Sequence, residues 1–189
     1  MTKYTNIYQN LLVAGALQSS GSTATTINSI SFGTGTTASG QFSQAYGSGT
    51  IASGQSSHAE GGNTIAGGTN SHAEGGGTIA SGTNSHAEGN LTIASGLYSH
   101  AGGSISVASG LGSFVHGSGS TASGINTIVL GNGITGTTDN TTYINQMFII
   151  SASTVPITNP TNGIIEYVEV VSGQTYLKYR DNQGNIITV

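Results

Sequence analysis

Residues 69–89 read TNSHAEGGGTIASGTNSHAEG, so the phrase Ser-His-Ala-Glu-Gly occurs twice at a spacing of 14 residues. The same spacing runs through the middle of the chain without a gap. Glycine recurs at positions 33, 47, 61, 75, 89, 103, 117 and 131, and again at 40, 54, 68, 82, 96, 110 and 124. Alanine recurs at 38, 52, 66, 80, 94, 108 and 122. Such a register indicates stacked structural repeats and argues against the disorder that a Gly/Ser/Thr-rich composition would otherwise suggest.

Each row contains two halves of the form small-x-Ala-x-Gly, for example Ser-His-Ala-Glu-Gly and Thr-Ile-Ala-Ser-Gly. Side chains of a strand alternate between its two faces, so Ser, Ala and Gly should point inward while His, Glu and Ile point outward. Two short strands and two glycine-containing turns then make one flattened coil. We therefore predict an all-β, 14-residue-repeat parallel β-roll or solenoid. Its core of small residues buries little apolar area, so the ends need caps and the roll needs association.

The composition excludes several classes of partner. Charged residues make up 5% of the 189 residues, against about 25% in ordinary globular domains. The three basic residues, Lys3, Lys178 and Arg180, provide no electrostatic footprint for nucleic acid or for an anionic membrane. The apolar run at 11–17 is shorter than the roughly 20 residues that span a bilayer, and it lacks the basic flank of a secretion signal. We expect no nucleic acid partner, no membrane insertion and synthesis without export.

The outward column that contains the histidines has apolar ends. It begins with Ile30 and ends with Phe114 and Ile128, and the neighbouring glutamate column begins with Phe32 and ends with Leu130. This pattern predicts that the face is covered along its length by another copy of the chain. Stacked carboxylates repel unless they are matched, and histidine can match them. The predicted inter-subunit residues are His58, His72, His86, His100, Glu60, Glu74, Glu88, Ile128 and Leu130.

The histidine column allows three other interpretations. An ion on a threefold axis, held by His58, His72, His86 and His100, is the alternative to a purely structural ladder, because imidazole nitrogens suit zinc or nickel. No other cofactor is expected. A pH-sensitive assembly follows if the histidines titrate near neutrality. Catalysis is not expected, because a repeated identical His/Glu pair lacks differentiated acid and base roles.

The opposite outward face leaves a second possibility open. Isoleucine occupies positions 51, 65, 79 and 93 there, with serine or glycine two residues later in each row. A flat, repeating face with little charge could bind ice or a glycan in a monomeric solenoid. The sequence therefore does not decide whether the His/Glu face or the Thr/Ile face forms the interface.

The columns resemble the head repeats of trimeric autotransporter adhesins, over roughly residues 29–133. The resemblance rests on Asn126-Thr127-Ile128-Val129-Leu130-Gly131 and on Asn84-Ser85-His86-Ala87-Glu88-Gly89. It implies a left-handed parallel β-roll that forms a homotrimer through the face where that family carries Val and Ile. The Ser-His-Ala-Glu-Gly variant also resembles repeats of bacteriophage fibre proteins.

The flanks complete the expected organisation. Residues 1–28 are an N-terminal anchor that resembles the attachment leader of phage fibres, 29–133 are the roll, 134–155 a connector with a strand over 142–150, and 156–189 a small antiparallel β meander that forms the tip. The expected function is a trimeric structural fibre of a phage virion, on the capsid or tail, that docks to another virion protein and reaches a host receptor or glycan. A secreted bacterial adhesin fragment is the alternative. The docking candidates are Tyr4, Ile7, Tyr8, Leu11 and Leu12, and the receptor-facing candidates are Tyr167, Tyr176 and Tyr179.

Overall fold

A computed structural model describes residues 17–19, 21–145, 164–181 and 183–188, and it divides the chain into two units, Met1–Asn145 and Gln146–Val189. All regular elements in these ranges are β-strands, which confirms the predicted fold class. No helix in the described ranges could cross a membrane. The predicted docking residues at positions 4–12 lie outside the described residues.

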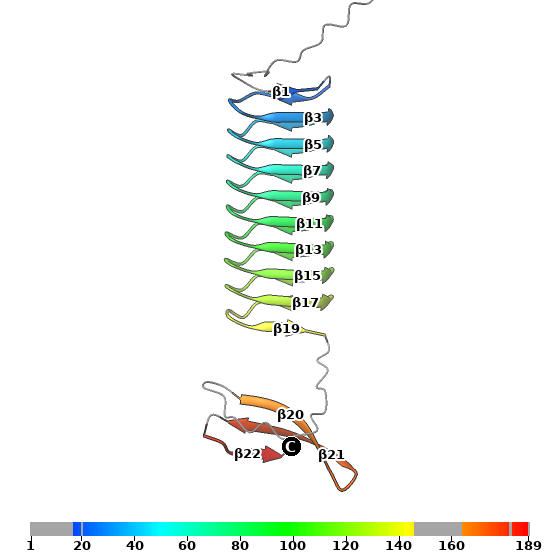
Figure 1. The fold of residues 1–189 in the computed structure, drawn as a ribbon, viewed down its shortest axis with the longest axis vertical. Helices are drawn as coiled ribbons and strands as arrows, with labels where there is room; N and C mark the ends of the chain where they lie inside the picture. The colour runs from blue at the N-terminus through cyan, green and yellow to red at the C-terminus, as the bar shows by residue number, and fades with distance from the viewer. Residues whose placement is uncertain (1–16, 20, 146–163, 182, 189) are drawn as a thin grey trace, which may run out of the picture. The chain divides into compact units, whose positions relative to one another are not determined.

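The first unit is a parallel β-roll with two sheets (Figure 1). One sheet has ten strands: β1 (Leu17–Gln18), β3 (Ile30–Thr34), β5 (Gln44–Ser48), β7 (His58–Gly62), β9 (His72–Gly76), β11 (His86–Asn90), β13 (His100–Ser104), β15 (Phe114–Ser118), β17 (Ile128–Asn132) and β19 (Thr142–Ile144). The other has nine: β2 (Thr23–Ala24), β4 (Thr37–Ala38), β6 (Ile51–Ala52), β8 (Ile65–Ala66), β10 (Ile79–Ala80), β12 (Ile93–Ala94), β14 (Val107–Ala108), β16 (Thr121–Ala122) and β18 (Thr135–Gly136).

Each coil pairs with the next in the register that the repeat predicts. His72 lies opposite His86 and Ala73 opposite Ala87, so identical residues stack along the roll. The backbone N–H of His72 donates to the carbonyl of Ser85 at 2.9 Å, and the N–H of Ile79 donates to that of Thr92 at 2.9 Å. The equivalent bonds recur from coil to coil. The 14-residue period is therefore the length of backbone needed to return to the same point one strand spacing further along.

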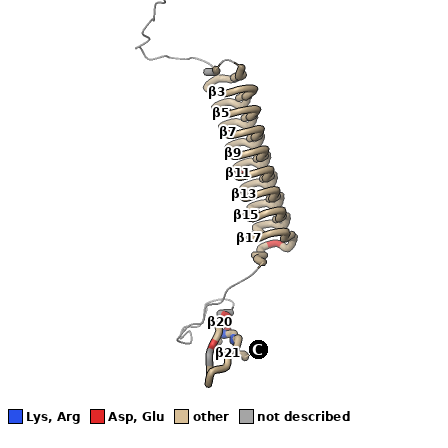
Figure 2. The backbone as a smooth tube through the Cα atoms, turned by 90° about the vertical axis from the view of Figure 1, so that its right-hand side faces the viewer, with Lys and Arg blue, Asp and Glu red and all other residues tan. Residues whose placement is uncertain are grey.

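The core between the two sheets is thin because small residues fill it. Its buried hydrophobic residues are alanines, with valine only at 115 and 129. Buried Ser and Thr side chains line the corners, and some of their hydroxyls bind local carbonyls: Ser85 Oγ donates to Gly82 at 2.7 Å and Thr92 Oγ1 to Glu88 at 3.0 Å. Other buried hydroxyls have no hydrogen-bond partner among the described residues: Ser43, Thr50, Ser57, Thr64, Ser71 and Ser113. Figure 2 shows the coils from the side as narrow stacked loops almost without charged residues. Such a core contributes little hydrophobic stabilisation per coil, so the stacked backbone hydrogen bonds carry much of the order.

Both glycine columns are required because neighbouring coils approach too closely for a Cβ. The column at 33–131 has φ between 93° and 157°, a region that side-chain-bearing residues rarely adopt. A Cβ on Gly61 would lie far inside contact distance of the Gly75 carbonyl oxygen. A Cβ on Gly54, in the second column, would meet the Gly68 carbonyl in the same way. One detail of the prediction is wrong: Gly61 is exposed and does not face the core, because its positive φ interrupts the inward–outward alternation within β7.

The corner that precedes each long strand requires a left-handed residue, and asparagine often supplies it. Asn70, Asn84, Asn126 and Asn140 all have φ between 51° and 55°. Asparagine tolerates this conformation better than most residues. Side-chain amides also link successive corners, because Asn70 Nδ2 donates to Asn84 Oδ1 at 3.2 Å and Asn126 Nδ2 to Asn140 Oδ1 at 3.2 Å.

The described coils extend beyond the predicted range 29–133 at both ends. The first coil keeps Ser22 and Ala24 in the small-residue columns, but Thr26 replaces glycine and its hydroxyl donates to the Gly40 carbonyl at 2.7 Å. The missing glycine hid this coil from the sequence pattern. At the other end β19 lies within the connector predicted for 134–155, and the remainder of the predicted strand at 142–150 is outside the described residues beyond Asn145.

Tyr143 caps the core at the end of the roll. It occupies the position of the inward alanines and packs against the core, and Gly136 leaves the room for its ring. Its hydroxyl accepts a hydrogen bond from the Thr138 N–H at 3.1 Å. Hydrogen bonding to the Thr138 side chain, and then to its backbone, lowers the pKa of Tyr143. An aromatic ring thus closes a core that is otherwise too thin to hold one.

The second unit contains the predicted antiparallel sheet. Its strands are β20 (Ile164–Val171), β21 (Gln174–Asp181) and β22 (Ile186–Thr188), in the order β20-β21-β22. The tight turn at Ser172 and Gly173 has positive φ at both residues, which suits a two-residue hairpin. Lys178 forms an ion pair with Glu169 across the first two strands.

Replacing Gly61 by alanine should destabilise the roll, whereas the same change at its neighbour Gly62 should not. Gly61→Ala forces a left-handed alanine against the next coil, and we expect a loss of about 3 kcal/mol in the free energy of unfolding. Gly62 has open space where a Cβ would lie, so Gly62→Ala should change stability by less than about 0.5 kcal/mol. Thermal and urea unfolding followed by circular dichroism would measure both. Equal stability of the two variants would contradict the close-approach argument.

Candidate functional site

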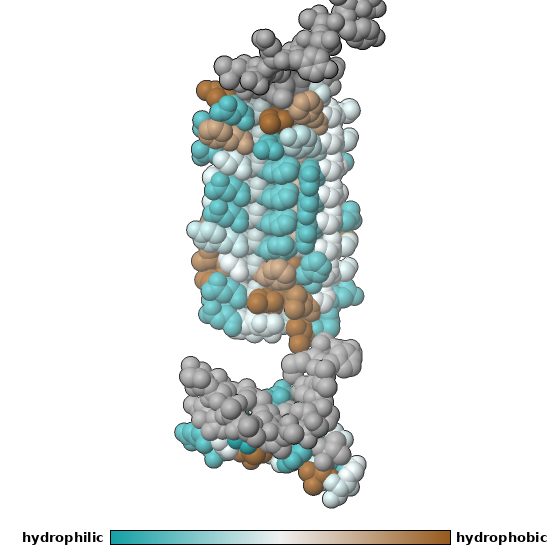
Figure 3. All heavy atoms as spheres, viewed as in Figure 1, coloured by the Kyte–Doolittle hydropathy of each residue, from teal (hydrophilic) through white to brown (hydrophobic). Residues whose placement is uncertain are grey.

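The four strands β7, β9, β11 and β13 place their histidines in one line on the outside of the long sheet. Each strand begins with histidine, then an alanine that enters the core. Glutamate follows in β7, β9 and β11, so His and Glu both point away from the core. Figure 3 shows the resulting polar column in the middle coils, with hydrophobic residues toward both ends of the roll. The predicted His58, His72, His86 and His100 and Glu60, Glu74 and Glu88 therefore share one face.

The histidine rings stack on one another at the spacing of the coils. The ring centroids of His58 and His72 are 4.8 Å apart with an interplanar angle of 5°, and those of His72 and His86 are 4.8 Å apart at 2°. The parallel stack ends at His100, whose ring is turned by 77° relative to that of His86. The repeat in sequence is thus not matched by a repeat in ring orientation at this coil.

Each glutamate lies beside the histidine of the following coil. The distance from a glutamate oxygen to histidine Nε2 is 4.0 Å for Glu60–His72, 3.6 Å for Glu74–His86 and 3.3 Å for Glu88–His100. An open groove lined by the glutamates and the adjacent glycines runs along this column. Because stacked carboxylates repel, the interleaved histidines provide the nearest compensating groups within the roll.

Within one chain, several polar atoms of this face have no hydrogen-bond partner among the described residues. The Nε2 atoms of His58, His72 and His86 are buried and have no hydrogen-bond partner among the described residues. Burial lowers the pKa of His58, and the neighbouring His72 lowers it further, while Glu60 and Glu74 act in the opposite direction. Polar groups buried without a partner cost free energy. The side chains of His58, Glu60 and His86 are still 33–45% exposed, so part of this face remains open to a second chain.

The hydrophobic ends of the face also lack a cover. Ile128 and Leu130, two predicted interface residues, are 39% and 43% exposed, and Phe32 at the other end is similarly exposed. These side chains lie in the same two outward columns as the histidines and glutamates. A surface that is apolar at both ends and half-buried in its middle is typical of an interface.

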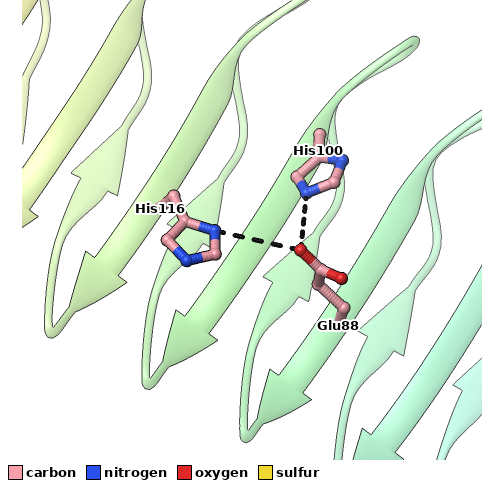
Figure 4. Close-up of side chains that lie close together, drawn as sticks. All are labelled: Glu88, His100 and His116. Atoms are coloured by element: carbon pink, nitrogen blue, oxygen red, sulfur yellow. Dashed lines mark hydrogen bonds and ion pairs between the residues drawn. The ribbon is translucent and has the colours of Figure 1, made fainter.

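One group on this face breaks the repeat. Gly102 stands where the pattern has glutamate, and His116 follows one coil later. Glu88 Oε1 lies 3.3 Å from His100 Nε2 and 3.8 Å from His116 Nδ1 (Figure 4). His116 is not among the site residues that the sequence predicts. The glycine at position 102, where the repeat has glutamate, could have pointed to His116, because it removes the side chain that would separate Glu88 from His116.

The remaining predicted residues are placed as follows. The isoleucines at 51, 65, 79 and 93 lie on the outer face of the short strands and form a column on the opposite side of the coil from the histidines. Tyr176 and Tyr179 lie on β21, three residues apart, and so project to opposite faces of the small sheet. Tyr167 lies on β20 opposite Lys178. The described residues thus do not bring Tyr176 and Tyr179 onto one surface.

The matched family model is that of a β-roll repeat. The profile of the YadA head domain repeat, which spans two repeat copies, matches residues 24–47, 45–71, 73–99 and 108–133. No curated protein matches the sequence significantly. The matched segments cover more than half of the chain and lie within the parallel roll, in agreement with the resemblance on which the sequence analysis relied. The chain therefore belongs to the family built from YadA head domain repeats.

Proposed function

We propose that three copies of this chain associate through the His/Glu face and form an adhesin-like fibre segment. The single observation that carries the proposal is the state of that face in one chain: buried, unpartnered histidine nitrogens in the middle and exposed isoleucine, leucine and phenylalanine at the ends. Association would bury the apolar ends and give the His and Glu columns neighbours from other chains. A threefold arrangement is the assembly that the adhesin resemblance implies.

The repetitive geometry favours a structural role over catalysis. The stacked His/Glu pairs repeat with little change from coil to coil, and they lie on a flat sheet face beside an open groove. General acid–base chemistry requires groups whose environments push their pKa values apart. A ladder of equivalent pairs instead fixes the register between chains, because a shift by one coil would place histidines against the apolar ends.

We further propose that the fibre belongs to a phage virion. The Ser-His-Ala-Glu-Gly repeats and the N-terminal segment with Tyr4, Ile7 and Tyr8 resemble phage fibre proteins, and the small antiparallel sheet resembles fibre tips. In this role the N-terminus docks to another virion protein, the roll is a spacer, and the C-terminal sheet is the distal element toward a receptor or glycan. A bacterial surface adhesin is the competing assignment for the same fibre.

Charge introduced on the His/Glu face should dissociate the assembly, whereas charge on the opposite face should not. We expect the wild-type native mass to be about three times the chain mass of 18.8 kDa. His86→Asp adds a carboxylate between Glu74 and Glu88 and should yield monomers. Ile79→Asp, on the outer face of β10, should keep the trimer. Analytical ultracentrifugation measures all three species.

Two results of that measurement would overturn the assignment. A trimer that is lost in Ile79→Asp and kept in His86→Asp would move the interface to the isoleucine face. A wild-type monomer would remove the fibre proposal altogether and leave the isoleucine column as a surface for ice or glycan. Circular dichroism of each variant controls for unfolding.

Acidification should weaken the roll. The pKa of His58 is lowered in the folded chain, so the stabilising contribution of its neutral form is complete above the ordinary histidine pKa near 6.5 and is lost as the pH falls through the lower folded value. We expect a lower melting temperature at about pH 5 than at about pH 8, with a smaller difference in His58→Gln. A pH difference that is unchanged in His58→Gln would exclude this histidine as a cause.

The location of the native protein distinguishes the assignment to a phage virion from the assignment to a bacterial surface. Purified phage particles and the cell envelope of the producing culture can each be digested and analysed by mass spectrometry for peptides of this chain. We expect the peptides in the particles at the abundance of a structural protein. Enrichment in the envelope and absence from particles would replace the virion assignment with that of a bacterial adhesin, without affecting the trimer.

A further inference from the structure

We propose that Glu88, His100 and His116 form a binding site for a zinc-like divalent metal ion within each chain. The three side chains come from the successive strands β11, β13 and β15, and one ligand atom of each lies within 4.8 Å of the others. One chain supplies all three ligands, although Glu88 and His100 also lie on the face proposed for the trimer. The proposed site differs from a site of histidines alone on a threefold axis.

The Glu88–His100 distance is that of a long hydrogen bond, the Glu88–His116 distance is longer, and both are close to the spacing of metal ligands. Glu88 Oε1 is 3.3 Å from His100 Nε2 and 3.8 Å from His116 Nδ1. An N–H···O hydrogen bond is usually about 2.9 Å long. Ligand atoms at bonds of 2.0–2.1 Å in a tetrahedron stand about 3.4 Å apart. The three ligand atoms lie within 4.8 Å of one another. His116 would have to move inward by up to about 1.4 Å to give three corners of a tetrahedral site, with the fourth corner left for water.

Three departures from the repeat coincide at this point of the roll. Gly102 replaces the expected glutamate, and a Cβ there would lie 2.5 Å from His116 Nδ1 and 3.0 Å from Glu88 Oε1. The absence of a side chain therefore creates the space in which the ligands meet. His116 supplies a nitrogen in a column that carries carboxylates in three earlier coils, at Glu60, Glu74 and Glu88, and glycine in the coil between. The His100 ring leaves the parallel stack and directs its Nε2 to Glu88.

The ligand chemistry selects a class of ion. Two imidazole nitrogens and one carboxylate oxygen suit zinc and neighbouring transition metals, whereas calcium and magnesium prefer oxygen ligands. The two other candidate groups in the described roll, Glu60–His72–Glu74 and Glu74–His86–Glu88, offer one nitrogen each. In the single chain the proposed site is open, because His116 is 54% exposed and His100 is 29% exposed. Glu88 and His100 also lie on the face proposed for association, so the ion would bind before the chains assemble.

Isothermal titration calorimetry of the full chain with zinc chloride tests the site. We expect one zinc per chain for wild type and a loss of affinity of at least about tenfold in His116→Gln. The matched control is His58→Gln, which makes the same replacement outside the site, at a column position that carries glutamine one coil earlier. It should keep the wild-type zinc affinity. Gly102→Ala should also weaken binding, because its methyl group would displace His116.

Several outcomes would overturn the proposal. Absence of zinc binding by the wild type would do so directly. Equal affinity of wild type and His116→Gln, or an equal loss in His58→Gln, would show that the ion binds elsewhere. One zinc per three chains would indicate a site on an axis. Circular dichroism at the titration temperature excludes unfolding of His116→Gln, whose exposed side chain makes few packing contacts.

Discussion

The stacking of one coil on the next at the spacing of hydrogen-bonded strands constrains every other feature of the roll. The backbone must return to the same point after each circuit, so the two glycine columns exist where adjacent backbones approach too closely for a side chain. The same spacing places the core alanines in contact and makes larger residues rare inside. Val115, Val129 and Tyr143 appear only near the end of the roll, where the column need not be continued.

Stacking also imposes a problem on the outer face, because identical charged residues would lie above one another. The roll meets it by pairing each glutamate with the histidine of the next coil, so that neighbours along a diagonal are complementary although neighbours within a column are alike. The rings of His58, His72 and His86 stack in parallel at the coil spacing. The remaining buried nitrogens and the apolar ends then define where a second chain gains most by binding.

In a repeat protein, residues that depart from the repeat are the first candidates for a specific chemical role. Gly102, His116 and the turned ring of His100 lie in adjacent coils, and each departs from its column. A departure that served packing alone would restore a similar side chain nearby. These three instead bring a carboxylate and two imidazoles together in a space from which a side chain has been removed, which is the reason to assign them a ligand.

The sequence by itself determined the period, the parallel register, the inward and outward columns and the small antiparallel sheet. In a periodic roll, residues of one column share the same environment, so their types indicate whether the column is buried or exposed. The sequence pattern did not predict the first coil, because Thr26 stands there in place of a glycine. It also predicted that Gly61 faces the core, because strand alternation does not take account of a residue with positive φ. Only the tertiary structure decided which glutamate lies beside which histidine. That pairing depends on the diagonal offset between strands and on side-chain rotamers. The proximity of His116 to Glu88 depends on the space above Gly102, which cannot be read from the order of residues alone.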